Sequence, residues 1–457
     1  MKCIFKKILA IVFAFALALT TFVGCSNEGG RVIESDDFTC REFENHIELV
    51  KYIGNEKNIT IPQEIKGKPV TVLAEGVFKN NITLLSVKLP NSVKTIGPEA
   101  FSHCTALSSI ELNEGVTALS EGAFSFCTAL KFVTLPSTLA VVSDNVFYQC
   151  VNLERVDFAD GLDEIKPYAF YSCRSLMLTD LPETLVTVGE GAFYGCNGTV
   201  TLELPDSVAT LGKGCFENCE GLTEFSSGIG LKTISDDAFK HCLKLNKITL
   251  NDGLEAIGSG AFSESVITDI SLPDSVINLG GSFNLCVNLT TAKLPKNIVR
   301  IPDNLFMGCK SLKTVTIPEN VVEIGANAFK GCESIEAIEM PKSLETVGDY
   351  AFSQCVQLKK IEFTDSLKTI GNWSFSQCAS LNEINLGNGL KTIGNNAFES
   401  CWTIKNITLP ESLESVGNEA FKSCSYLYRI TVEKEKGSLD TSNWGMGFSV
   451  RWKPKTK

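Results

Sequence analysis

Cysteine is the residue of this chain with the widest range of chemistry, since thiols form disulfides, ligate metals and act as nucleophiles. The 457-residue sequence contains 18 cysteines, and fourteen of them, from Cys104 to Cys424, lie three residues after a recurrent phenylalanine. Side chains that share one phase of a repeat point the same way, so a disulfide between neighbours would be strained. The column therefore predicts small buried thiols, with partial oxidation between adjacent repeats as the alternative. Cys40 and Cys215 lie outside this column.

The histidines and the short motifs do not assemble a metal site or a catalytic site. No C-x-x-C pair occurs, and consecutive thiols of one column offer no tetrahedral set for zinc. His103 and His241 lie six repeats apart, and His46 lies near the N-terminus. The sequence has no Ser-His-Asp arrangement, no G-x-S-x-G and no glycine loop for phosphate. We therefore expect no catalytic residue, no metal and no cofactor.

The element that positions these residues is a repeat of 23 residues marked by phenylalanine. One interval is two residues short, and all the others are 23 residues long. A fixed period between 20 and 29 residues means that one small unit is stacked many times, so the fold class is a repeat solenoid. The series consists of Phe78, Phe101, Phe124, Phe147, Phe170, Phe193, Phe216, Phe239, Phe262, Phe283, Phe306, Phe329, Phe352, Phe375, Phe398 and Phe421.

The unit from Leu312 to Cys332 shows how one repeat is built. The residues up to Ile317 alternate apolar and polar side chains and predict a short parallel β-strand. Pro318 ends this strand because proline has no amide N–H, and Gly325 allows a bend after a second extended piece. The stretch that follows is expected to form a helical or irregular turn that carries Phe329 inward.

This repeat resembles the BspA-type leucine-rich-repeat family of bacterial surface proteins. The matching motifs are Ile317-Pro318, Ile324-Gly325 and Ala328-Phe329-x-x-Cys332, together with their equivalents in the other repeats. The resemblance covers roughly Phe38 to Val432 and implies a leucine-rich-repeat solenoid. Members of the family are associated with adhesion to host matrix proteins and to other cells, so the resemblance implies a binding role.

The period divides the chain into four parts and marks one irregular place. We expect a signal peptide over 1–24, a lipidated tether over 25–37, the solenoid over 38–432 with degenerate cap coils to about 77, and a C-terminal cap or tail over 433–457. Around Phe262 the column cysteine is replaced by Ser265, and one residue is missing on each side of Pro273. This irregularity predicts a local change of curvature or a soft joint.

The N-terminal segment is typical of a targeting signal. Three lysines precede an unbroken apolar run, Ile8 to Leu19, which is too short to span a membrane comfortably. Phe22-Val23-Gly24-Cys25 resembles the bacterial lipobox, in which the cysteine is lipidated and becomes the mature N-terminus. We therefore expect an exported, surface-exposed protein that is attached to the membrane only through lipid on Cys25. The alternative is an ordinary signal peptide that is cut nearby.

The charge of the chain excludes one class of partner. The formal net charge is −12, and no basic tract precedes a short basic tail after Arg451. Such a surface repels nucleic acid, so no nucleic-acid partner is expected.

Aromatic residues at a repeated phase are the first candidate ligand-binding residues. Tyr148, Tyr171 and Tyr194 follow the phenylalanine in three consecutive repeats, and Phe126 lies close by. Side chains at one phase of a solenoid form a surface column, so these tyrosines are expected to form an aromatic ladder. Exposed rings of this kind are typical of protein interfaces and of sites where sugars stack.

Two smaller groups of apolar side chains are further candidates. Phe132 and Leu178 occupy sheet positions that are polar in most repeats. Tyr350 and Trp373 share a phase two residues before the phenylalanine, and Trp402 lies one repeat later in another column. The alternative for all these residues is that the rings fold over the turns and shield the core.

These observations lead to one main functional hypothesis and two alternatives. The main hypothesis is a lipid-anchored, adhesin-like surface protein that binds host extracellular matrix protein, mucin or other cells. The first alternative is a glycan-capture lipoprotein that stacks the sugars of a surface glycan on the tyrosine ladder. The second alternative is an architectural protein of the cell envelope, for which neither surface matters.

Overall fold

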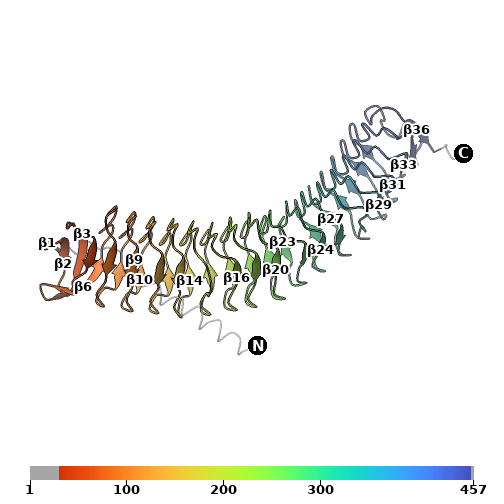
Figure 1. Ribbon diagram of the computed structural model, residues 1–457. Helices are drawn as coiled ribbons and strands as arrows, with labels where there is room; N and C mark the ends of the chain where they lie inside the picture. The colour runs from red at the N-terminus through yellow and green to blue at the C-terminus, as the bar shows by residue number, and fades with distance from the viewer. Residues whose placement is uncertain (1–29, 454–457) are drawn as a thin grey trace.

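The computed structural model describes residues 30–453, which form one continuous curved stack of coils (Figure 1). The signal peptide and Cys25 lie outside the described residues. All regular structure between residues 30 and 453 is β-strand, so the turn after each second strand is irregular rather than helical. It follows that no described segment is a helix long and apolar enough to cross a membrane.

Most coils contribute one strand of three or four residues to a first row of parallel strands, here called row A. Proline follows many of these strands and ends them, as Pro318 does after β26, because it cannot donate to the ladder. The strands of row A are β4 (Asn58–Thr60), β7 (Ser86–Lys88), β9 (Ser109–Glu111), β11 (Phe132–Thr134), β13 (Arg155–Asp157), β16 (Thr201–Glu203), β18 (Glu224–Ser226), β20 (Lys247–Thr249), β22 (Asp269–Ser271), β24 (Thr291–Lys293), β26 (Thr314–Thr316), β29 (Lys360–Glu362), β31 (Glu383–Asn385), β33 (Asn406–Leu409), β35 (Arg429–Val432) and β36 (Ser449–Trp452).

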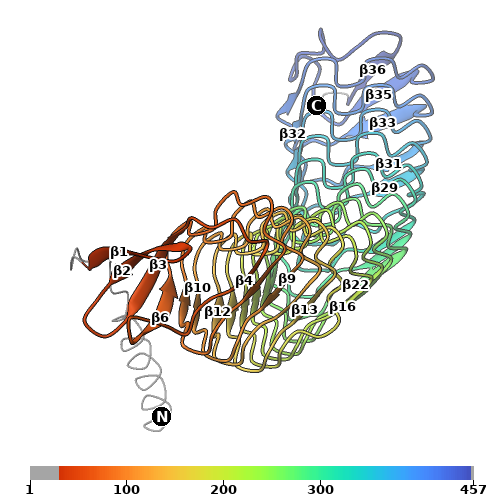
Figure 2. The ribbon, with the colours of Figure 1, turned by 60° about the vertical axis from the view of Figure 1, so that its left-hand side comes forward.

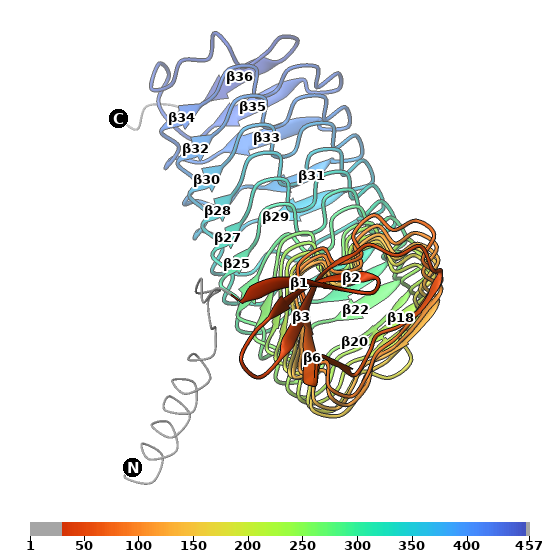
Figure 3. The same cartoon turned by 90° about the vertical axis from the view of Figure 1, so that its left-hand side faces the viewer.

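A second row of parallel strands, here called row B, lies on another side of each coil, as the view in Figure 3 shows for β32 and β33. Its strands are two residues long, except for the six-residue β6 at its N-terminal end. They are β6 (Lys68–Leu73), β8 (Thr95–Ile96), β10 (Ala118–Leu119), β12 (Val141–Val142), β14 (Glu164–Ile165), β15 (Thr187–Val188), β17 (Thr210–Leu211), β19 (Thr233–Ile234), β21 (Ala256–Ile257), β23 (Asn278–Leu279), β25 (Arg300–Ile301), β27 (Glu323–Ile324), β28 (Thr346–Val347), β30 (Thr369–Ile370), β32 (Thr392–Ile393) and β34 (Ser415–Val416).

The N-terminal end of the solenoid is closed by antiparallel strands. β1 (Arg31–Ser35) pairs with β2 (Phe38–Glu42), β2 pairs with β3 (Ile47–Tyr52), and β3 joins row B through β6. The short β5 (Glu64–Ile65) pairs with β6. Since β1 lies inside the segment assigned to a tether over 25–37, the folded unit begins before Phe38.

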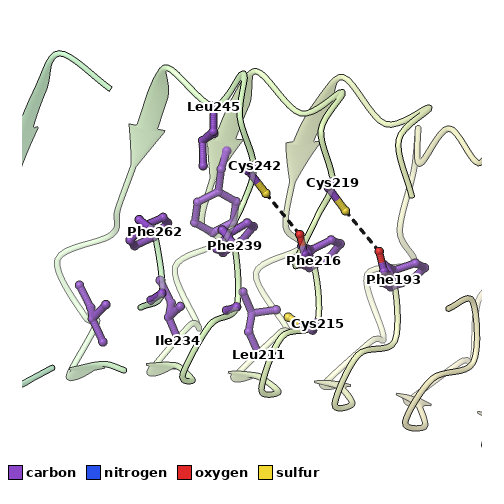
Figure 4. Packing of buried hydrophobic residues seen from close by; sticks show 14 of the residues in the cluster. Phe193, Leu211, Cys215, Phe216, Cys219, Ile234, Phe239, Cys242, Leu245 and Phe262 are labelled. Carbon is purple, nitrogen blue, oxygen red and sulfur yellow. Dashed lines mark hydrogen bonds between the residues drawn. The ribbon is translucent and has the colours of Figure 1, made fainter. Parts of the chain in front are cut away.

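The recurrent phenylalanines form a spine along the centre of the stack. All sixteen are buried, and neighbouring rings lie 5.0–6.1 Å apart between centroids. Figure 4 shows four of these rings, Phe193 to Phe262, in line inside the coils. A single unit buries too little apolar surface to offset its own ordering, so the spine is what makes the coils stable as a stack.

The column cysteines donate hydrogen bonds to the backbone carbonyls of the spine phenylalanines. Each column Sγ–H donates to the carbonyl of a phenylalanine in an adjacent coil, as Cys219 does to Phe193 at 3.2 Å and Cys242 to Phe216 at 3.3 Å (Figure 4). All sixteen described cysteines are free and buried, which confirms the prediction for the fourteen of the column and holds for Cys40 and Cys215 as well. Burial raises the pKa of the Cys219 thiol to about 12, which leaves the thiolate scarce and the sulfur unreactive.

The stack changes direction at the coils that carry β23 to β27 (Figures 1 and 2). Row B is interrupted here, because β23 pairs only with β21 and β25 pairs only with β27. In most other coils an N–H at this position donates to the preceding coil, as Gly325 does to Ile301 at 2.9 Å. Pro302 occupies the same position and has no N–H to donate. The change of curvature expected after Phe262 is therefore present, and Pro302 accounts for the break in the ladder.

Candidate binding surface

The turn that follows row B holds each phenylalanine between two residues of left-handed backbone. In almost every coil the residues two before and two after the phenylalanine have φ near +60°, as Glu99 and His103 do around Phe101. The N–H groups in this turn donate to the next coil, for example from Phe101 to Ala123 and from His103 to Ser125, both at 2.8 Å. This third ladder fixes the outward side chains one coil spacing apart, which is the spacing of stacked rings.

The predicted tyrosines stack on one another in this ladder. Tyr148 and Tyr171 lie 4.9 Å apart between ring centroids with planes 7° apart, and Tyr171 and Tyr194 lie 4.4 Å apart with planes 9° apart. Phe126 continues the series at 5.5 Å from Tyr148 with a tilt of 59°, and His103 stacks on Phe126 at 4.3 Å. The result is five rings in five consecutive coils, here called the aromatic ladder. The sequence had not indicated His103 as a member.

Within the stack of tyrosines, the central ring presents its edge and hydroxyl to solvent rather than its faces. Tyr171 has Tyr148 on one face and Tyr194 on the other. The Asn218 amide donates to the Tyr194 hydroxyl at 2.6 Å, and the Tyr168 hydroxyl donates to Glu190 at 2.6 Å beside the ladder. Burial, followed by the neighbouring phenols of Tyr194 and Tyr148, raises the pKa of Tyr171, so its hydroxyl stays a hydrogen-bond donor at neutral pH.

Some aromatic residues occupy backbone positions that disfavour them. About half of the left-handed positions flanking the spine hold glycine, asparagine or aspartate, but φ is +60° at Phe126, +58° at Tyr168 and +58° at Trp373. A bulky residue in this region costs about 1–2 kcal/mol. The stack therefore carries rings at positions where glycine or asparagine would stabilise the coil more, which is common at functional sites.

The second predicted cluster forms only in part. Tyr350 and Trp373 stack at 5.9 Å with planes 2° apart, and the Lys330 ammonium lies 4.9 Å from the centroid of Tyr350. Among residues 30–453, Trp402 has no aromatic ring against it, and its side chain is 52% exposed. The phase difference noted in the sequence thus separates Trp402 from the pair.

Of the two predicted sheet residues, Phe132 is exposed and Leu178 is buried. Phe132 on β11 is 59% exposed and borders a groove of about 450 Å³ that runs over β4, β7 and β9. The expectation for Leu178 is wrong, because its side chain is buried. Its coil has no strand in row A, and the Leu178 N–H donates instead to the Thr199 hydroxyl at 3.1 Å. The alternation is therefore inverted, with Thr179 exposed in its place.

The histidines take part in packing. His103 belongs to the aromatic ladder, His46 stacks on Phe43 at 4.5 Å, and His241 lies 3.0 Å from the Glu264 carboxylate. No three His, Cys, Asp or Glu side chains come together in residues 30–453 as a metal site requires.

One surface feature escaped the sequence reasoning. Ile277, Val299 and Val322 occupy one phase in three consecutive coils and are 60%, 59% and 41% exposed. The first two line a groove of about 540 Å³ at the break between β23 and β25. Aligning the repeats by phase would have revealed it, because the same position holds charged residues such as Glu255 and Glu345 on either side.

Comparison with protein families supports this description of the repeat. The family model described as "BspA type Leucine rich repeat region (6 copies)" matches residues 51–177, 163–282, 280–378 and 345–443. The chain therefore matches it over most of its length, and no catalytic family is indicated. The comparison with curated proteins found no match.

A solved leucine-rich-repeat structure shares the fold, and two others are more distant. A leucine-rich repeat protein from Bacteroides ovatus is 25% identical over 92% of this chain and 100% of its own, with a TM-score of 0.64. A leucine rich cell surface protein from Faecalibacterium prausnitzii is 19% identical over 94% of this chain and 97% of its own, with a TM-score of 0.33. The pneumococcal vaccine antigen PcpA is 17% identical over 93% and 88%, also with a TM-score of 0.33.

Proposed function

Since the chain belongs to the BspA-type leucine-rich-repeat family, we propose that it is an adhesin-like surface protein that binds a macromolecule through the aromatic ladder. Proteins of this family are typically found at the cell surface, which agrees with the targeting signal in the sequence. Lipid on Cys25, outside the described residues, is the proposed attachment. The proposed partners are a host matrix protein, a mucin or a protein of another cell.

The five stacked rings of the aromatic ladder carry this proposal. Five coils at about 4.8 Å spacing make a strip about 19 Å long, which fits a protein interface better than a single sugar. Tyrosine offers large apolar area and a polar tip at low entropic cost, which suits it to such interfaces. The strained backbone at Phe126 is a second support, because stability alone favours glycine or asparagine there.

The geometry weighs against the glycan alternative at this site. A sugar stacks on a free ring face, and both faces of Tyr171 are covered by neighbouring tyrosines. The edges and hydroxyls that remain suit a flat protein partner, which meets several coils at once.

The test is binding of the chain from Cys25 onward, without lipid, to paired panels of immobilised matrix proteins and glycans. The triple variant Tyr148→Ala, Tyr171→Ala, Tyr194→Ala removes the centre of the ladder. We expect it to lose at least 30-fold in affinity for the matrix protein that the parent binds, because interface energy concentrates in a few aromatic anchors. Circular dichroism and thermal unfolding check that the variant stays folded.

Two controls distinguish the ladder from general effects. The triple Tyr→Phe variant keeps the stack and removes only the hydroxyls, so it should retain most of the affinity. Asn284→Ala with Met307→Ala changes the same phase in two coils that have no ladder and should have no effect. Binding retained by the triple alanine variant would move the site elsewhere. If the parent bound nothing on either panel, the architectural role would be favoured.

A further inference from the structure

The last three strands of row A lie in segments that carry an excess of positive charge. In β33, β35 and β36, Asn406 pairs with Arg429 and Arg429 pairs with Ser449, whereas Thr408 pairs with Thr431 and Thr431 pairs with Arg451. The segments 402–409, 425–432 and 446–453 contain four cations and no carboxylate, although the whole chain has a net charge of −12. The matching segments of the three preceding coils, 333–340, 356–363 and 379–386, each contain at least one glutamate. The cations are Lys405, Arg429, Arg451 and Lys453.

These cations are not neutralised in the way that others on row A are. In earlier coils a lysine reaches a glutamate one coil away, as Lys247 reaches Glu224 at 2.9 Å and Lys359 reaches Glu336 at 2.6 Å. Within residues 30–453, Lys405, Arg429 and Arg451 form no ion pair, and Lys453 approaches Glu411 only at 3.9 Å. The face therefore offers guanidinium and ammonium groups that are available to an anion.

Exposed rings lie beside the cations. Trp402, Tyr426 and Tyr428 are 52%, 66% and 53% exposed, and no aromatic ring of the described chain stacks on them. The Tyr426 N–H donates to the Trp402 carbonyl at 3.3 Å, and the Tyr428 N–H to the Lys405 carbonyl at 3.1 Å, so the groups lie side by side in two coils. The Arg429 guanidinium lies 5.6 Å from the centroid of Tyr428. This combination of rings and cations, here called the C-terminal face, lies at the β33–β36 end in Figures 1 and 2.

We propose that the C-terminal face binds an acidic polysaccharide, at a site separate from the aromatic ladder. Arginine pairs with the planar carboxylate or the sulfate of a sugar through two parallel N–H donors. Open faces of tryptophan and tyrosine accept the apolar face of a sugar ring. Arg429 and Arg451 lie one strand and two residues apart, about 8 Å between α-carbons, so they meet successive anionic groups of a chain laid across the strands. The excess of cations on an otherwise acidic molecule selects an anionic partner.

The experiment measures binding of the full chain to dextran sulfate, carboxymethyl dextran and neutral dextran, which share one backbone. We expect binding to one or both charged polymers, none to neutral dextran, and weakening as salt rises. The variant Arg429→Gln with Arg451→Gln should bind at least tenfold more weakly. Lys293→Gln with Lys313→Gln is the matched control, since it removes the same charge from exposed positions on β24 and just before β26, and it should bind like the parent.

A second variant tests the rings. Trp402→Leu with Tyr428→Leu keeps every charge and should weaken binding several-fold without changing the salt dependence. Polyglutamate is measured in parallel, and the proposal expects it to be insensitive to the ring variant and weaker than the sulfated polymer. Equal losses in the two charge variants would reduce the effect to net charge and overturn the proposal. Binding to neutral dextran, no binding to either charged dextran, or preference for polyglutamate would also overturn it.

Discussion

The aromatic ladder and the C-terminal face use the same kinds of side chain in opposite ways. In the ladder, Tyr148, Tyr171 and Tyr194 share one phase of the repeat, so their rings cover one another at 4.4–4.9 Å. At the C-terminal face, Trp402 and Tyr428 lie at different phases in neighbouring coils, and no ring in residues 30–453 covers them. In a solenoid the phase of an aromatic residue therefore decides whether its face or its edge is available.

The two regions also differ in charge, because carboxylates lie beside the ladder and cations lie at the C-terminal face. Glu190 accepts from the Tyr168 hydroxyl beside the ladder, and Glu217 continues the ladder column after Tyr194. The C-terminal face instead has Arg429 and Arg451 without carboxylate partners in the described chain. The two surfaces should therefore select different partners, and each prediction below changes one region while leaving the other as its reference.

The largest effect is expected from the core beneath each region. Phe170, under the ladder, is fully buried between Phe147 and Phe193 at 5.3 and 5.2 Å, and Trp444 closes the last coil at 6.4 Å from Phe421. Replacing either by alanine should cost about 3–5 kcal/mol. Because coils interact only with their neighbours, Trp444→Ala should open the C-terminal coils alone, whereas Phe170→Ala should open the coils of the ladder. Hydrogen exchange resolved by peptide measures both.

This prediction has a clear reverse outcome. If Trp444→Ala lowered protection around Tyr148 and Tyr194 as much as around Tyr428, the solenoid would unfold as one unit. The two surfaces could not then be manipulated independently, and the comparison between them would fail.

The sequence predicted the spine, the cysteine column and the stacking of three tyrosines because each depends only on phase. It did not predict features that depend on where the backbone of a coil is left-handed or forms a strand. The left-handed residues that place His103 and Phe126 in the ladder have no distinctive residue type, since glutamate, tyrosine and tryptophan also occur there. Leu178 points inward because its coil has no strand in row A. The residues of that coil do not indicate that the strand is absent.

The sequence indicated Trp402 and a basic tail after Arg451, but their union with Tyr426 and Tyr428 in the C-terminal face was missed for a related reason. Phase alignment emphasises residues that recur, whereas Trp402, Tyr426 and Tyr428 each occur once in their columns as aromatic residues. Their contact depends on the ladder bonds between neighbouring coils, such as that from Tyr428 to Lys405. The missing carboxylates are visible in the sequence, but only when segments of equal phase are compared.

A change of intermediate size in the free energy of unfolding should distinguish backbone strain at Phe126 from the loss of ring stacking. Phe126→Gly loses the ring but relieves a left-handed residue, while Tyr148→Gly loses a ring from ordinary backbone. The relief is worth about 1–2 kcal/mol, so Phe126→Gly should be less destabilising than Tyr148→Gly by about that amount. Denaturant unfolding gives the two free energies. Equal losses would mean that the backbone at Phe126 is not strained, and the argument that its ring is kept for binding would lose its support.

The smallest effect is a dependence on alkaline pH to which Tyr171 of the ladder should contribute. Burial and the neighbouring phenols raise the pKa of Tyr171 above the ordinary value of about 10, so the folded state prefers the neutral phenol. Its contribution to stability is therefore complete below pH 10 and is lost as the pH rises through the raised value. Tyr171→Phe, which cannot ionise, should lessen the alkaline loss of stability, as followed by thermal unfolding from pH 8 to 11. An alkaline loss that is unchanged in Tyr171→Phe would show that burial and stacking have no influence on the phenol.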